Sequence, residues 1–168
     1  MAPAIARGDT IRVDAHVAGS GTIYRGDIIM FTSPRDATSL LVKRVIGLPG
    51  DRIQLKAGIV NINGNAVPTI AAGQAKVEIT EGETANAKIL RETLPEGSYV
   101  QIYDVGTTLL DNTQEFKTRH EHYSVMGDNR DNSADSRMSL SAGGIGFVPQ
   151  ASVVGIVDLK KSTKRVPR

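Results

Sequence analysis

The stretch that most restricts the fold is Gly127 to Arg137, which reads GDNRDNSADSR. Its largest apolar side chain is that of Ala134, and most of the others need polar partners. Asn, Asp, Gly and Ser favour turns and local hydrogen bonds to the backbone, so this stretch cannot be a core strand. It predicts a rigid polar loop, held by its own hydrogen bonds and by arginine–carboxylate pairs. Apolar segments at Tyr123 to Met126 and Gly146 to Pro149 are expected to anchor the loop in a β-rich body.

A second stretch, Leu40 to Asp51, reads LLVKRVIGLPGD and places a lysine inside a β-branched apolar run. Burying a charged ammonium is costly unless it is paired or becomes neutral. Alternate residues of a strand face the same way, so Leu41, Lys43 and Val45 share one face. A lysine acts as a general base only when it is neutral, which requires desolvation by apolar neighbours. Lys43 is therefore the candidate general base; taken alone, such a lysine is more often a strand residue that reaches solvent.

The pattern elsewhere predicts antiparallel β structure. Two segments, RIQLK at Arg52 to Lys56 and IVNI at Ile59 to Ile62, alternate well enough for a hairpin, and Asn63-Gly64 marks a further reversal. Pro49-Gly50 suits the centre of a type II turn. Further on, AKVEIT and YVQIY read as strands, while ILRETL fits a helix or a strand, and we favour a hairpin partner.

The two key stretches, with RGDIIMF at Arg25 to Phe31 before them, resemble the signature boxes of the type I signal peptidases. These are serine proteases with a Ser/Lys dyad. The resemblance covers Met1 to about Val67 and Tyr123 to about Val157. It implies a mainly β protein with an antiparallel sheet or barrel-like catalytic core at residues 1–68 and 123–160. A smaller, variable β insertion is expected at 69–122 and a basic tail at 161–168.

The resemblance also implies roles for individual side chains. Ser133 matches the family serine whose hydroxyl hydrogen-bonds the base lysine, here Lys43, and fixes its orientation. Five charged residues are expected to form structural pairs beneath the site: Arg44, Asp128, Arg130, Asp135 and Arg137. Four apolar residues fall where the walls of shallow substrate pockets are expected: Met1, Ile5, Leu41 and Val42.

Met1 to Val13 aligns with the nucleophile box of the family. Met1 to Pro3 fall on its Met-x-Pro and Gly8-Asp9 on its Gly-Asp, while Ala4 replaces a common Thr. In this alignment the nucleophilic serine precedes Met1, so we expect the polypeptide as written to be inactive. Three explanations stay open: a cut just after the nucleophile, a start at the methionine of the box, or a natural homologue without the group. We favour the cut.

The function that the resemblance implies is removal of N-terminal signal peptides from exported preproteins through an acyl-enzyme. The expected partners are signal peptides and, through an anchor absent from this chain, the outer face of the bacterial cytoplasmic membrane. No cofactor and no metal are implied. One alternative is an inactive homologue that only binds signal peptides. Another, a self-cleaving Ser/Lys repressor, would need an Ala-Gly cleavage segment and a DNA-binding domain, and neither is visible.

The composition excludes other classes. The chain has no cysteine, which excludes disulfides and thiol catalysis. The basic surplus lies mostly in residues 160–168 and only 4% of residues are aromatic, so no nucleic-acid partner is expected. That tail is a membrane contact or, as we favour, a solvated terminus. The sequence contains no run of about 18 apolar residues, so it predicts no transmembrane helix within these residues.

Two weaker candidates remain. The pair His120 and His122 looks like part of a metal site, although no third ligand stands nearby (His16 is far away in the sequence), and a solvated strand edge is the preferred interpretation. Ser20 lies between two glycines with no predicted base near it, so it is a poor nucleophile candidate.

Overall fold

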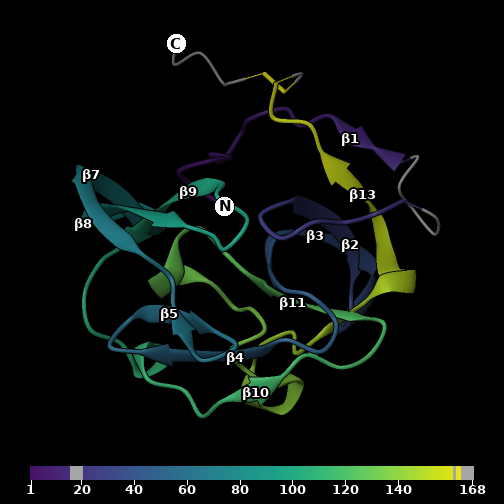
Figure 1. The fold of residues 1–168 in the computed structure, drawn as a ribbon. Coiled ribbons are helices and arrows are strands. Elements are labelled where there is room, and N and C mark those ends of the chain that lie inside the picture. The colour runs from purple at the N-terminus through teal and green to yellow at the C-terminus, as the bar shows by residue number, and fades with distance from the viewer. Residues whose placement is uncertain (16–20, 161, 164–168) are drawn as a thin grey trace.

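The computed structural model describes residues 1–15, 21–160 and 162–163, and within them the chain forms three antiparallel sheets (Figure 1). The first sheet has the order β1 (Val13–Asp14), β13 (Val153–Val157), β2 (Ile28–Ser33), β3 (Asp36–Gly47), β11 (His122–Met126), β12 (Val148–Pro149). The second has the order β10 (Phe116–Lys117), β4 (Arg52–Lys56), β5 (Ile59–Ile62), β6 (Asn65–Ala66). The third has the order β7 (Thr69–Thr80), β8 (Glu83–Thr93), β9 (Tyr99–Asp104).

The helical segments are short 3-10 turns: η2 (Leu109–Asp111), η3 (Arg130–Asn132), η4 (Leu140–Ala142) and η5 (Gln150–Ser152). The prediction of a mainly β, antiparallel fold is confirmed. Across the described residues, the sheets stay open at their edge strands and do not close into a barrel. In that part of the chain no helix has the length and apolar character needed to cross a membrane.

Strand β3 is apolar on both sides because it separates two cores. Val45 packs into a cluster with Ile29 and Phe31 of β2, whereas its neighbour Ile46 packs into a cluster with strands β4 and β5. Successive side chains of a strand point to opposite faces, so a strand with two buried faces needs a continuous apolar run. This explains the sequence that surrounds Lys43.

The turn predictions are confirmed. Gly50 has φ 90° and Asp51 N donates to Leu48 O over 3.0 Å, which closes the turn after β3. Strands β4 and β5 pair as a hairpin, and Asn63 and Gly64, with φ 53° and 86°, reverse the chain into β6. The left-handed backbone is tolerated best by glycine and asparagine.

Residues 69–122 form the whole third sheet and contribute strand β10 to the second. All of ILRETL except its last residue, Leu94, lies in β8, which pairs with both β7 and β9, so the hairpin interpretation of that segment is confirmed. Strand β10 joins β4 in the second sheet. The division of the chain at 68 and 122 stays a prediction. Ser20, His16 and most of the basic tail lie outside the described residues.

Candidate active site

Lys43 and Ser133 meet in the structure. Lys43 lies on β3 opposite Ile29 of β2, and Ser133 directly follows η3. The Lys43 Nζ donates a hydrogen bond of 2.7 Å to Ser133 Oγ in a partly buried position. The structure therefore brings together the two side chains that the sequence singled out, ninety positions apart. Their catalytic roles stay predictions.

The environment of Lys43 disfavours its charge. Burial lowers the pKa of the Lys43 amine from its ordinary value of 10.5, and the positive charge of Arg137 lowers it further. The carboxylates of Asp135 and Asp128 act in the opposite direction without reversing the shift. A buried ammonium loses hydration that nearby charges only partly replace, so the neutral amine is favoured relative to a lysine in water.

Gly127 allows the loop to approach this pair. A Cβ atom at position 127 would overlap the Oγ of Ser133, would lie 2.7 Å from its Cβ, and would lie 3.5 Å from Lys43 Nζ. No larger residue fits there without moving Ser133. The Gly127 N–H donates to Asp135 Oδ2 over 3.1 Å, which joins the start of the loop to its later part.

Asp135 and Arg137 form a buried pair at the base of the loop. Arg137 donates from Nε to Asp135 Oδ1 and from Nη2 to Asp135 Oδ2, both over 2.9 Å, and the two side chains are 1% and 0% exposed. Burial alone would raise the pKa of Asp135, but its hydrogen bond to Arg137 and the charge of that residue outweigh burial, so the pKa is lowered. The Ser133 hydroxyl contributes a further hydrogen bond that acts in the same direction.

A second pair joins the loop to β3. Arg44 donates from Nε and Nη2 to the two oxygens of Asp128, each over 2.7 Å, and both side chains are buried. Arg44 and Lys43 are neighbours with side chains on opposite faces of β3. The loop is thus fixed to this strand on both faces, by an ion pair on one side and by the Ser133 contact on the other.

A third pair involves Arg130, which was expected to form a structural pair, but its partner was not foreseen from the sequence. Arg130 donates to both carboxylate oxygens of Glu92 on β8, over 2.7 and 2.5 Å, and Glu92 is 1% exposed. Asp131 accepts from the backbone N–H groups of Val105 and Gly106 after β9. The third sheet therefore supports the loop from a segment that the sequence predicts only as a variable β insertion. The sequence shows only that Glu92 is a charged residue in a stretch that otherwise suits a β-strand, and this does not identify its partner.

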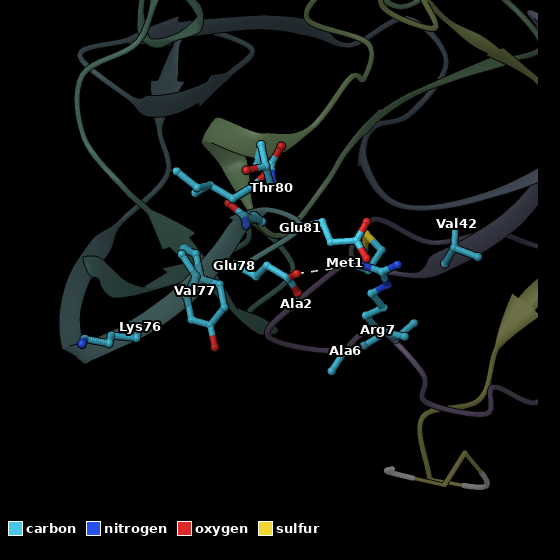
Figure 2. A pocket seen from close by; sticks show the side chains of 15 residues that line it. Met1, Ala2, Ala6, Arg7, Val42, Lys76, Val77, Glu78, Thr80 and Glu81 are labelled. Carbon is cyan, nitrogen blue, oxygen red and sulfur yellow. Dashed lines mark hydrogen bonds and ion pairs between the residues drawn. The ribbon is translucent and has the colours of Figure 1, made fainter. Parts of the chain in front are cut away.

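Three of the four predicted pocket residues surround one cavity. Met1, Ile5 and Val42 line a cavity of about 730 Å³, whose far wall is formed by residues 76–81, mostly of β7. Figure 2 shows Met1 and Val42 on one side of this space and Val77 and Glu78 on the other. Leu41 is not among the lining residues; it packs against the core cluster that contains Val45. Lys43 does not line the cavity either, because its side chain leaves β3 on the face opposite Val42.

The amino group of Met1 is affected by the charge of the candidate base. Burial lowers its pKa, and the positive charge of Lys43 lowers it further. The carboxylate of Asp128 acts in the opposite direction without reversing the shift.

Part of β3 has an unoccupied edge. Strand β11 pairs with β3 only at Arg44, Val45 and Gly47, so among the described residues no strand pairs with Leu40 to Lys43 on that side. Unpaired backbone groups of this kind accept an added strand. The edge ends at Lys43, where the loop begins to cover the sheet.

The histidines do not form a metal site in the part of the chain that the structure describes. No group of three or more His, Cys, Asp or Glu side chains lies close enough there to hold a metal ion. His122 begins β11, and its Nδ1 hydrogen-bonds the carbonyl of His120.

Comparison with known proteins identifies the family of the chain. Residues 1–160 match the family model described as signal peptidase, peptidase S26. The signal peptidase I of Rickettsia bellii (strain OSU 85-389) is 36% identical over 135 residues, covering 76% of this chain and 44% of its own. That of Rickettsia conorii (strain ATCC VR-613 / Malish 7) is 39% identical over 132 residues, covering 74% of this chain and 46% of its own. The chain thus spans less than half the length of these relatives.

A solved structure is also similar. The signal peptidase I of Enterococcus faecalis V583 shares 27% identity and a TM-score of 0.48, over 82% of this chain and 97% of that one. The family model covers nearly the whole sequence, and the Rickettsia relatives cover about three quarters of it. The chain belongs to the signal peptidases of peptidase family S26, and within them to type I.

Proposed function

We propose that this chain is the catalytic part of an endopeptidase that removes N-terminal signal peptides from exported preproteins, with Lys43 as general base. The observation that carries the proposal is the 2.7 Å hydrogen bond between Lys43 Nζ and Ser133 Oγ beside a partly buried strand. A lysine whose pKa is lowered by burial is suited to accept a proton near neutral pH. The membership of the chain in the signal peptidase family supports the same chemistry.

The nucleophile in this proposal is a serine joined to Met1. Lys43 takes the proton from its hydroxyl as the oxygen attacks the scissile carbonyl, and later returns a proton to the leaving amine. Ser133 accepts a hydrogen bond from the lysine and keeps its amine directed at the nucleophile. A backbone N–H beside the nucleophile stabilises the oxyanion. Water then hydrolyses the acyl-enzyme with Lys43 again acting as base.

The substrate adds to β3 as an extended strand. The free edge at Leu40 to Lys43 offers backbone hydrogen bonds, and it ends at the candidate base. Met1, Ile5 and Val42 supply apolar walls for the side chains next to the cleaved bond. From the resemblance to the family, we expect small residues such as Ala beside the cleaved bond. Leu41 packs toward the core, and its part in substrate binding is the weakest of the four.

The location that fits this substrate is the outer face of the bacterial cytoplasmic membrane, where signal peptides emerge. The partners are the signal peptides of exported preproteins and the membrane surface. This location is carried over from the family, whose curated members are longer than this chain.

The experiment compares two polypeptides in a peptidase assay. One is the 168-residue chain, and the other is the same chain with a serine joined to Met1. We expect turnover of a peptide with Ala before the cleaved bond only in the serine-containing form. Replacing that Ala by Leu should abolish cleavage.

Matched lysine variants test the role of Lys43. In the serine-containing form, Lys43→Met should lose activity by at least about 10²-fold, whereas Lys56→Met, at an exposed position on β4, should lose none. Equal activity with and without the serine would contradict the proposal. Saturable binding of the peptide without turnover in either form would favour the alternative, a signal-peptide-binding module.

A further inference from the structure

Asn129 occupies an unusual position in the wall of the cavity. It lies between Asp128 and Arg130, it is 9% exposed, and it lines the cavity together with Met1 and Val42. Its side-chain Oδ1 is buried and has no hydrogen-bond partner among the residues that the structure describes. A buried amide oxygen without a partner destabilises the folded state, because water satisfied it in the unfolded chain.

The neighbours of Asn129 are fixed by their own hydrogen bonds. Asp128 is held by two hydrogen bonds from Arg44, and Arg130 makes two to Glu92. The backbone is fixed too, since Tyr103 N donates to Asp128 O over 2.8 Å. The fold therefore holds the backbone of Asn129 in place, so only a rotation of its side chain can bring the amide to a partner.

A second asparagine of the same loop makes the contrast clear. Asn132 lines the same cavity, but its Nδ2 donates to the carbonyl of Ile79 on β7 over 2.8 Å. This contact ties the loop that carries Ser133 to the far wall of the cavity. The side chain of Asn132 thus makes a structural hydrogen bond, whereas the Oδ1 of Asn129 has no partner among the described residues.

We propose that the side-chain amide of Asn129 hydrogen-bonds the main chain of the polypeptide substrate where that chain passes through the cavity. The inference rests on the proposed function. An amide carries the same donor and acceptor as a peptide group, so it recognises the main chain whatever the side chains are. The cavity volume of about 730 Å³ is within the usual range for ligand sites, about 300–1,000 Å³.

The route of the substrate leads to this residue. A peptide added along β3 reaches Lys43, beyond which β11 occupies the edge of the strand. The cavity begins beside this point at Met1 and Val42 and extends to β7, as the side chains in Figure 2 show. The peptide that continues past the free edge therefore enters the cavity, with Asn129 in its wall.

The test replaces Asn129 by leucine, an apolar residue of similar size. Binding of a fluorescent signal-peptide analogue is measured on the 168-residue chain, and kcat/KM on the form with a serine joined to Met1. We expect Asn129→Leu to weaken binding and kcat/KM by about five- to tenfold, through a higher KM with kcat unchanged. Its melting temperature should stay equal or rise, because an unpartnered polar group has been removed.

Asn61 provides a matched control. It is an asparagine of similar burial, 8% exposed, on β5, and its amide donates to the carbonyl of Ile59 over 3.0 Å. Asn61→Leu should lower the melting temperature and leave peptide binding unchanged. The opposite pattern of the two variants separates a substrate contact from a structural one.

Substrate length gives a second readout. The loss of binding affinity caused by Asn129→Leu should vanish for a shortened peptide. The peptide is shortened at the end that enters the cavity, so it no longer reaches Asn129. Unchanged binding in Asn129→Leu, or a penalty that is the same for every peptide length, would overturn the inference. Absence of turnover in every serine-containing form, with the binding difference intact, would contradict the proposed function and still support the contact.

Discussion

The carboxylate of Glu92 on β8 holds both terminal nitrogens of Arg130, and so joins the third sheet to the loop that carries Ser133. Both side chains are almost fully buried, at 1% and 5% exposed. Removing one partner leaves a buried charge without its counterion. Glu92→Gln should therefore reduce the free energy of unfolding by about 3–5 kcal/mol in urea denaturation. The apolar double variant Glu92→Leu/Arg130→Met should recover most of that loss.

The exposed pair of Arg52 and Glu115 is the control for this prediction. Its side chains are 55% and 46% exposed and 3.6 Å apart. Glu115→Gln should change the unfolding free energy by less than about 1 kcal/mol. Equal effects of Glu92→Gln and Glu115→Gln would show that the buried pair does not hold the loop.

The Asp135–Arg137 pair predicts how stability depends on acid. The pKa of Asp135 is lowered from its ordinary value of 3.8, so the folded state holds the ionised form more strongly than the unfolded chain does. Its contribution is fully present above pH 3.8 and is lost as the pH falls through the lower folded-state value. The difference in unfolding free energy between wild type and Asp135→Asn should be constant near neutral pH and shrink only in strong acid. A difference that grows as the pH falls would contradict the assignment.

Lys43 predicts the opposite trend with pH. Because its folded-state pKa lies below 10.5, the protonated amine destabilises the folded chain, and this penalty disappears as the pH rises toward 10.5. Lys43→Met should raise the melting temperature at neutral pH, and the gain should diminish in alkaline buffers. Lys56→Met, at an exposed position, should show no comparable gain. A loss of stability in Lys43→Met at neutral pH would contradict the burial of a charged amine.

Gly127 predicts a defect confined to the site. A methyl group at this position would displace Ser133, because it would overlap the hydroxyl oxygen. In the serine-containing form, Gly127→Ala should lower kcat by about 10²-fold, since a misplacement of about 1 Å is enough for such a loss. Gly47→Ala crowds Thr118 and Ser124 instead, at 2.8 and 2.9 Å, and should lower stability while keeping kcat. Equal kcat in Gly127→Ala and wild type would remove Ser133 from the account.

The local features of the fold were predictable from the sequence. The polar stretch 127–137 has no apolar side chain larger than that of Ala134, and the run around Lys43 fits a strand with two covered faces. Turns at Pro49-Gly50 and Asn63-Gly64 follow from the backbone preferences of their residues. The resemblance to the family added the pairing of Lys43 with Ser133, which no local pattern contains.

The other contacts between distant segments were not predictable. Glu92 and Arg130 are far apart in the sequence, and the ILRETL segment was ambiguous between helix and strand, so nothing pointed to a buried partner. The far wall of the cavity comes from β7, a strand whose sequence shows only that it is a strand. Asn129 looked like one more polar residue of the loop. Its lack of a partner appears only once the packing around it is known.

The central claim is that Lys43 is a base held in a poorly solvated place beside Ser133. NMR titration of the lysine side chains, with the Lys43 signal assigned by its absence in Lys43→Met, measures this directly. The account predicts a titration midpoint for Lys43 clearly below 10.5. A midpoint at or above 10.5 would mean that the amine is charged and hydrated, and that Lys43 is not the base.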